Sequence, residues 1–237
     1  MAEKAKIKER SRLKILGIDT SSEFLNIAWS EDKDIIKEES YLLDRKHASQ
    51  LVPKVMGLLK RHRVSINKID AFVIGLGPGS FTGLRIGVSA IKGFGIATGK
   101  PCVGVASIDS IACNARGCDK AIVPIIDAKR GQVYAAIYKR KCELVDRLSD
   151  YMLLPIDKLM AKIKTQPVFL GDGVSLYRDN ILSINKKAIF LEKKDWYPGA
   201  GNLIMLGFAR VKKAKKNNMD KLAPLYLYPK DCQVKKP

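Results

Sequence analysis

The sequence predicts an α/β protein of two lobes, each built on a mixed sheet. Segments with strand patterns alternate with segments with helix patterns along the chain, which is typical of sheets covered by helices. The two halves also begin alike, because "IDTSSEFLNIAW" and "IDAKRGQVYAAI" match in outline when Asp19 and Asp127 are aligned. This faint repeat suggests a duplicated lobe.

The first half opens with a strand, a tight turn and a second strand. In "LKILGIDTSSEFLNIAWSE" (13–31), apolar and β-branched residues flank a polar turn that begins at Asp19, as they do in hairpins. Three further strands are predicted in "KDIIKEESYLL", "DAFVIGLG" and "PCVGVAS".

Two helices are predicted between these strands. Apolar residues across 47–64 have helical spacing, and Pro53 either kinks this helix or lies near its first turn. A long apolar helix is predicted from Ser80 to about Gly99, with Ser80 or Thr82 as its cap. The second helix is apolar all round and must be covered on every side, either by a partner protein or by a third layer of the same chain.

The second half repeats the plan. "AIVPIIDAKRGQVYAAIYK" (121–139) predicts strand, turn and strand, "PVFLGDGV" and "KAIFL" predict strands, and "SLYRDNIL" and "GNLIMLGFARVKKAKK" (201–216) predict helices. We divide the chain into a disordered basic leader (1–12), an N-terminal lobe (13–107), a C-terminal lobe (108–230) and a tail (231–237). The last helix could pack back on the first lobe.

The chain is strongly basic. It has 43 lysines and arginines against 24 aspartates and glutamates, a net charge of +19. Basic clusters lie in the leader, in "NKKAIFLEKKDW" and in "RVKKAKKNN". Such clusters favour contact with RNA, but they lack interleaved aromatic residues on which bases would stack. A solvated lysine-rich surface is the alternative.

Composition also bears on the compartment. No apolar run reaches the ~18 residues of a membrane span. The five cysteines form no C-x-x-C pair, which argues against a disulfide framework or a zinc site and favours a reducing cytoplasm. We expect inert thiols, because nothing in the sequence would activate them.

The stretch "GLGPGSFTGLRIG" (75–87) looks like a phosphate-binding loop. Its glycines can turn backbone amides toward an anion, and the following helix start adds positive partial charge. It lacks, however, the lysine of a Walker A loop, the glycine spacing of a Rossmann fingerprint and the G-x-S-x-G of a nucleophile elbow. The alternative is that the glycines permit close packing of the helix.

The chain is poor in catalytic residues. His47 and His62 lie at the two ends of one predicted helix, so they cannot share a metal, and neither neighbours an obvious nucleophile. Asp19 and Asp127 could converge across a cleft. We therefore predict no catalytic residue and no metal site.

Four stretches point to a known family: "ILGIDTSSE", "GLGPGSFTGLRIGVSAIKGFG", "GVASIDSIA" and "IIDAKRGQVYAAIY". With the closing "APLYLYP", they make the chain resemble the bacterial TsaB family, also called YeaZ, from Leu13 to Pro229. The resemblance implies the two-lobed actin-like (ASKHA, ribonuclease H-like) fold of Hsp70 and sugar kinases. It also implies a part in forming N6-threonylcarbamoyladenosine in tRNA, next to the anticodon.

The resemblance further implies partners. Members of this family pair with a catalytic TsaD-type subunit, are joined by a TsaE-type ATPase, and form homodimers in isolation through the same surface. TsaD-type subunits bind a metal through a His-x-x-x-His helix, whereas "HASQL" keeps His47 and has Leu51 at the second position. Kinases of the superfamily place a glycine where this chain has Ser21. Both departures imply that ATP and metal belong to the partner subunits.

Two groups of site residues follow from the resemblance. For the partner surface on the two helices we select His47, Leu51, Val55, Leu58, Phe81, Leu84, Val88 and Ile91. For a vestigial nucleotide or phosphate cleft we select Asp19, Thr20, Ser21, Gly77, Gly79 and Ser80.

We therefore expect a non-catalytic cytoplasmic scaffold that dimerises with and activates the TsaD-type subunit, with tRNA as substrate of the complex. Three alternatives stay open. They are an independent ATP-binding small-molecule kinase or ATPase of the same superfamily, a peptidase acting on the partner, and a free-standing RNA-binding module.

Overall fold

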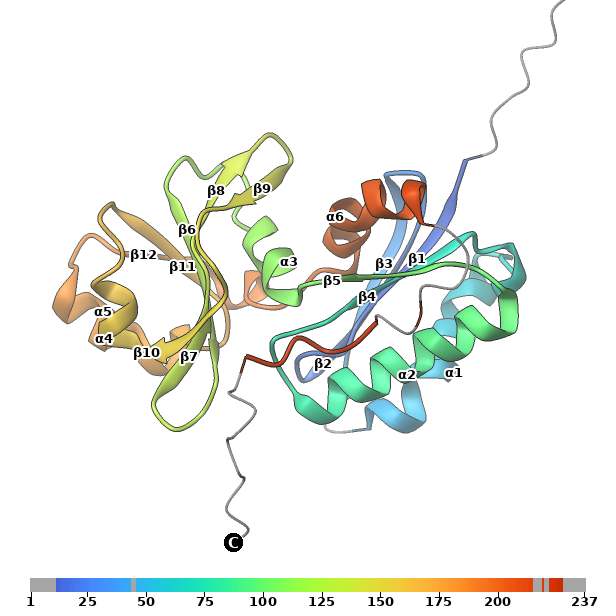
Figure 1. Cartoon of the computed structure of the whole chain (residues 1–237), viewed down its shortest axis with the longest axis horizontal. Coiled ribbons are helices and arrows are strands. Elements are labelled where there is room, and N and C mark those ends of the chain that lie inside the picture. Colours follow the sequence, from blue (N-terminus) through green and yellow to red (C-terminus); the bar gives the residue numbers. More distant parts are fainter. Residues whose placement is uncertain (1–11, 44–45, 215–218, 220–221, 228–237) are drawn as a thin grey trace, which may run out of the picture.

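The computed structural model describes residues 12–43, 46–214, 219 and 222–227. Two lobes lie side by side, each with its own sheet (Figure 1). Of the predicted leader, Arg12 alone is described, and the predicted tail (231–237) lies outside the described residues. The division of the chain into four ranges stays a prediction.

The sheet of the first lobe has the strand order β3-β2-β1-β4-β5. Its strands are β1 (Lys14–Asp19), β2 (Phe24–Glu31), β3 (Asp34–Leu42), β4 (Ala71–Gly75) and β5 (Cys102–Val105). β1, β2 and β3 pair antiparallel, while β4 pairs parallel with both β1 and β5. These strands agree with the segments predicted from the sequence.

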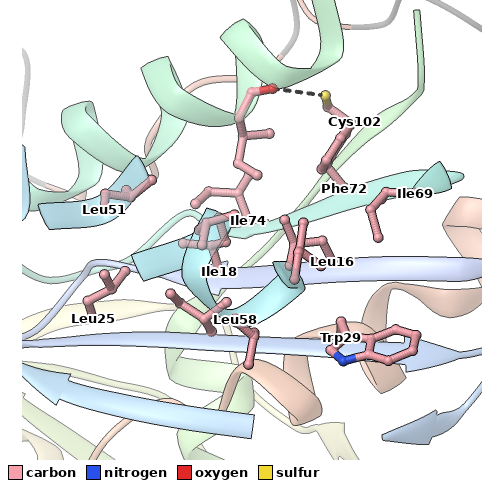
Figure 2. Close-up of a cluster of buried hydrophobic side chains, with 14 of the residues drawn as sticks. Leu16, Ile18, Leu25, Trp29, Leu51, Leu58, Ile69, Phe72, Ile74 and Cys102 are labelled. Carbon is pink, nitrogen blue, oxygen red and sulfur yellow. Dashed lines mark hydrogen bonds between the residues drawn. The ribbon is translucent and has the colours of Figure 1, made fainter. Parts of the chain in front are cut away.

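Helices cover both faces of this sheet. The helices α1 (His47–Arg61) and α2 (Phe81–Thr98) lie on one face, and α6 (Ala200–Lys213) lies on the other (Figure 1). Successive residues of β1 point to opposite sides, so that Ile15 packs beneath α6 whereas Leu16 and Ile18 pack toward α1 and α2 (Figure 2). Because both faces are buried, the central strand is a continuous apolar run.

The helix boundaries have local causes. α1 ends at Arg61 rather than Val64, because Arg63 adopts a left-handed φ of 55° that a right-handed helix cannot continue. α2 begins where the Ser80 hydroxyl accepts a hydrogen bond from the Gly83 amide at 3.2 Å. Ser80 is therefore the cap, and Thr82 is not. α2 ends at Thr98, because the next residue, Gly99, adopts a left-handed φ of 66° and caps the helix.

The second sheet repeats the first. Its main strands are β6 (Ala121–Asp127), β7 (Gln132–Ala135), β10 (Met152–Pro155), β11 (Pro167–Leu170) and β12 (Ile189–Phe190). β6 pairs antiparallel with β7 and parallel with β11. The order β10-β7-β6-β11-β12 thus matches β3-β2-β1-β4-β5 in sequence order and in strand direction. The predicted fold of two duplicated mixed-sheet lobes is confirmed.

The remaining elements complete the second lobe and the connection between the lobes. They are η1 (Ile66–Lys68), α3 (Ser107–Cys113), β8 (Tyr138–Lys141), β9 (Leu144–Arg147), α4 (Ile156–Met160), α5 (Val174–Ile184) and η2 (Lys193–Asp195). α3 contacts both α6 and β6. α6 follows the second lobe in the chain yet packs on the first sheet. Within the described residues, no helix has the length and apolarity that crossing a membrane requires.

Candidate functional site

The predicted nucleotide cleft is centred on Asp19, the last residue of β1. Its side chain is fully buried. One carboxylate oxygen, Oδ1, accepts from the Ser21 amide at 2.8 Å and from the Ser21 hydroxyl at 2.6 Å. The other, Oδ2, accepts from the Ser107 hydroxyl at 2.6 Å. Both oxygens are thus engaged by groups of the same chain.

Burial controls the electrostatics of this carboxyl group. Desolvation raises the pKa of Asp19, and the hydrogen bonds from Ser107 and Ser21 oppose this rise without cancelling it. A fully buried carboxyl with a raised pKa and three bound donors is closed to an external ligand.

The glycine-rich loop is tied to this cluster through its backbone. The Gly77 amide donates to the Ser107 hydroxyl at 2.9 Å, and the Gly77 carbonyl accepts from the Ser107 amide at 2.7 Å. The Ser80 amide donates to the Ser21 carbonyl at 2.7 Å. These two loop amides are therefore engaged within the fold instead of pointing at an anion.

Close approach explains why glycines stand here. A Cβ atom at Gly79, whose φ is 156°, would overlap the carbonyl oxygen of Ser21, and one at Gly83 would overlap the carbonyl oxygen of Thr20. The Thr20 hydroxyl donates to the Gly83 carbonyl at 2.8 Å. Of the two uses considered for these glycines, the contacts support close packing of α2 against the β1–β2 turn.

The six residues predicted for the cleft therefore do come together, but the sequence did not point to Ser107. This serine joins the Asp19 carboxylate to the glycine-rich loop. It begins α3, far along the chain from both. The stretch "GVASIDSIA" contains it, but nothing in that pattern indicates its contact with Asp19.

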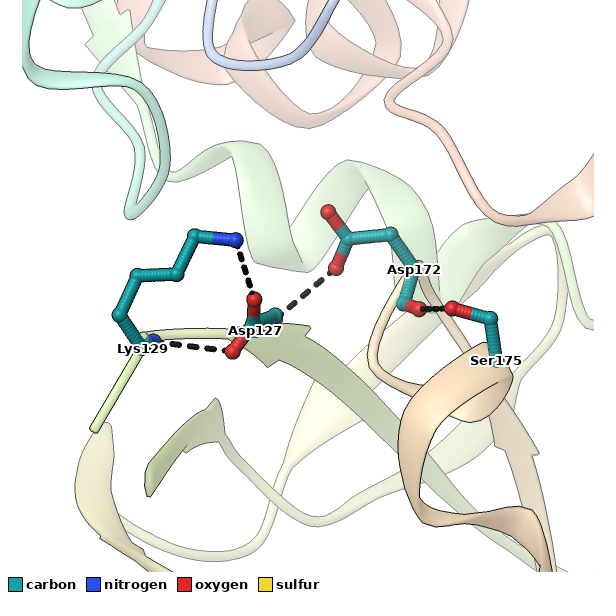
Figure 3. A network of polar contacts seen from close by, with 4 residues as sticks. All are labelled: Asp127, Lys129, Asp172 and Ser175. Carbon is teal, nitrogen blue, oxygen red and sulfur yellow. Dashed lines mark hydrogen bonds and ion pairs between the residues drawn. The ribbon is translucent and has the colours of Figure 1, made fainter. Parts of the chain in front are cut away.

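Asp127 occupies the corresponding place in the second lobe, at the end of β6. Its Oδ2 atom pairs with the Lys129 ammonium at 2.5 Å, and its backbone amide donates to Asp172 Oδ1 at 2.9 Å (Figure 3). Burial raises the pKa of Asp172. Asp19 and Asp127 are thus each engaged by neighbours of their own lobe, so the structure does not pair them as a two-carboxylate centre.

Among the histidines and cysteines, His47, Cys102 and Cys113 are buried. Across the described ranges, no three His, Cys, Asp or Glu side chains cluster in a way that could hold a metal ion. Leu51 is buried in the core. Burial raises the pKa of the Cys102 and Cys113 thiols to about 11, which leaves them protonated and weakly nucleophilic near neutral pH. Cys232 lies outside the described residues.

Comparison with known proteins places this architecture in a family. A family model described as "TsaD: tRNA N6-adenosine threonylcarbamoyltransferase" matches residues 40–235. The tRNA threonylcarbamoyladenosine biosynthesis protein TsaB of Bacillus subtilis (strain 168) is 33% identical over 225 residues, which cover 93% of this chain and 96% of the relative. The chain belongs to the TsaB family.

Solved structures support the fold of this TsaB-family chain. YeaZ from Pseudomonas aeruginosa is similar with a TM-score of 0.78 at 24% identity, covering 91% of this chain and 100% of that one. Component A of the (R)-2-hydroxyglutaryl-CoA dehydratase of Acidaminococcus fermentans is similar with a TM-score of 0.52 at 10% identity, covering 84% and 99%. The predicted actin-like fold is confirmed.

Most of the residues predicted to contact a partner lie in the core of this TsaB-family chain instead of on its surface. All but Phe81 are buried in the core of the first lobe, namely His47, Leu51, Val55, Leu58, Leu84, Val88 and Ile91. They face the sheet or the neighbouring helix. A partner could therefore touch these side chains only if the core opened.

The two helices expose other apolar side chains. Val52 and Met56 are exposed on α1, and Phe81 and Ile96 are exposed on α2, with Ile96 73% exposed. Val52 and Met56 lie one turn apart on the same side of α1. These are the residues that the helices of this TsaB-family chain present at the surface.

Part of α2 is covered from within the chain. The Tyr226 ring lies 5.4 Å from the Phe81 ring, and the Arg85 guanidinium lies 3.8 Å above the Phe81 ring. The Leu225 amide donates to the Leu76 carbonyl at 2.8 Å. The 222–227 segment therefore contacts the start of α2, where Phe81 stays 52% exposed, while Ile96 near the end of the helix is 73% exposed.

Proposed function

We propose that this chain is a non-catalytic scaffold subunit in the formation of N6-threonylcarbamoyladenosine in tRNA, and that it dimerises with and activates a TsaD-type catalytic subunit. The name of the Bacillus subtilis relative supports the pathway. The match of residues 40–235 to the TsaD family model supports a partner of similar fold.

The contacts of Asp19 with Ser21 and Ser107 support the proposal that the chain is non-catalytic. A fully buried carboxylate engaged by Ser21 and Ser107 is in no position to act on a substrate. The loop that would hold a phosphate donates its Gly77 and Ser80 amides to the chain itself. In this proposal nucleotide and metal are bound by the TsaD-type and TsaE-type subunits.

The exposed side chains of α1 and α2 support the proposal that these helices contact the TsaD-type subunit. Val52, Met56 and Ile96 are apolar and exposed on two helices that contact each other. Burying such residues against a second protein is favourable by about 25 cal/mol per Å² of apolar surface. The same surface would serve a homodimer when the partner is absent.

Reconstitution tests the function as a whole. Purified TsaD-type subunit, TsaE-type ATPase, tRNA and a threonylcarbamoyl donor are combined with and without this chain, and modified adenosine is measured. We expect formation to depend on the chain. Full activity without it would refute the scaffold role, and tight ATP binding by the isolated chain, lost on Asp19→Asn, would favour the kinase alternative.

A surface variant tests the partner face. Met56→Asp places a charge among the exposed apolar side chains of α1, so we expect the heterodimer to weaken at least tenfold, a cost of about 1.4 kcal/mol. Leu176→Asp is the matched control, because Leu176 is an exposed leucine on α5 of the second lobe. Co-elution with the TsaD-type subunit on size exclusion reads out both. Equal binding by the two variants would place the interface elsewhere.

A further inference from the structure

A pocket of about 520 Å³ lies where the two lobes meet beside α6, and it shares no residue with the predicted nucleotide cleft. Its floor is the sheet of the first lobe. Phe24 and Asn26 of β2 and Glu38 and Ser40 of β3 stand at alternate positions, so they point to the same face. Segments 114–116 and 193–199 and the first turn of α6 form the walls.

Hydrogen bonds hold these walls in place. The Asn114 amide donates to the carbonyls of Asp195 at 2.9 Å and Tyr197 at 2.8 Å, and its side-chain oxygen accepts from the Asn202 amide at 2.7 Å. The Tyr197 hydroxyl donates to Glu23 at 2.7 Å. Hydrogen bonds between four separate segments therefore fix the shape of the pocket.

One polar group in the floor of the pocket lacks a hydrogen-bond partner among the described residues. The side chain of Asn26 is 3% exposed, and its Nδ2 atom is buried with no hydrogen-bond partner among the residues that the structure describes. An unsatisfied buried amide costs about 1–3 kcal/mol. Since Asn26 lines the pocket, an acceptor atom of a bound molecule would satisfy it.

The rim adds positive charge. Arg116 and Lys193 both line the pocket and are exposed. Neither side chain forms a hydrogen bond or ion pair with any part of the chain that the structure covers. Two acids also line the pocket: Glu38 accepts from the Gly201 amide at 3.1 Å, and Asp195 stands in the wall. The Phe24 and Tyr197 rings, 4.6 Å apart, supply an apolar wall.

We propose that this pocket binds a small organic anion, either a carboxylate or a phosphate ester. An oxygen of the ligand accepts from the Asn26 amide on the floor, and its negative charge faces Arg116 and Lys193 at the rim. Charge-assisted hydrogen bonds to a guanidinium are stronger than neutral ones, so Arg116 contributes most of the affinity. This site goes beyond the scaffold role and does not depend on it.

Titration of the full chain with two probes tests the site. Succinate represents the carboxylates and glycerol 3-phosphate the phosphate esters, each added at constant ionic strength. Calorimetry gives the dissociation constant, and the side-chain amide signal of Asn26, assigned by its loss in Asn26→Ala, reports the location by NMR. We expect one probe to shift that signal saturably, and the probe that does so identifies the ligand class.

Matched arginine variants make the test specific. Arg116→Gln should weaken binding about tenfold or more, and Asn26→Ala should weaken it as well. Arg63→Gln should bind as wild type, because Arg63 is an exposed arginine that follows α1 on the opposite side of the sheet. The proposal is overturned if neither probe saturates the Asn26 signal, or if Arg116→Gln binds as tightly as wild type.

Discussion

At the scale of single residues, the Asp19 carboxylate is subject to two opposing effects. Hydrogen bonds from Ser21 and Ser107 favour its charged form, whereas burial disfavours it. Burial is the larger effect, so the pKa is raised above the ordinary 3.8. Asp19 is here a structural group that ties the end of β1 to Ser21 and Ser107.

This raised pKa predicts a pH dependence of stability. The folded chain holds the Asp19 proton more tightly than the unfolded chain, so the free energy of unfolding falls as pH rises above 3.8. Asp19→Asn lacks this titration. The wild-type free energy of unfolding minus that of the variant should therefore decrease between about pH 4 and pH 7, as measured by urea unfolding. A difference that grows with pH would contradict the burial argument.

At the scale of elements, the sequence predicted α1, α2, α5 and α6, missed the short helices α3 and α4, and did not show which way each side chain faces. The spacing across 47–64 predicted α1, and the run from Ser80 predicted α2. α2 is apolar all round, so its pattern leaves the covered side undetermined. Val88 and Ile91 were predicted at the surface but pack on the sheet, while Ile96 is exposed. The answer depends on where β4 and the 222–227 segment lie, which local spacing does not encode.

The packing of α2 against the β1–β2 turn can be tested by substituting two glycines of this helix. A Cβ at Gly87 would overlap the Thr20 hydroxyl and lie 3.0 Å from Ile74 Cδ1, whereas one at Gly93 would meet nothing within 4 Å. We expect Gly87→Ala to lower the free energy of unfolding by about 1–3 kcal/mol. Gly93→Ala, the matched control, should raise it by about 0.5–1 kcal/mol. Urea unfolding measures both, and equal stabilities would mean that α2 is not held against the turn.

At the scale of the whole molecule, polar contacts between distant segments fix the two lobes relative to each other. Ser110 donates to the Gly199 carbonyl at 2.7 Å, and Asn114 and Tyr197 extend the same network toward β2. The duplication of the lobes could be predicted from the match around Asp19 and Asp127, although β8, β9 and β10 of the second sheet were missed. The network between the lobes could not be predicted, because its members are single polar residues without a motif. In the proposed scaffold role, this network would hold the second lobe in a constant orientation relative to α1 and α2.

The net charge of +19 is also a property of the whole chain, and it predicts how the isolated protein binds RNA. Lysine clusters bind phosphates by releasing counterions, without reading sequence. We therefore expect equal binding of tRNA and of a mixed-sequence RNA of the same length, with affinity falling about 10³-fold between about 50 and 200 mM salt. Fluorescence anisotropy at several salt concentrations measures this. Binding that selects tRNA and persists at the higher salt would favour the free-standing RNA-binding module, because specific contacts, unlike counterion release, survive added salt.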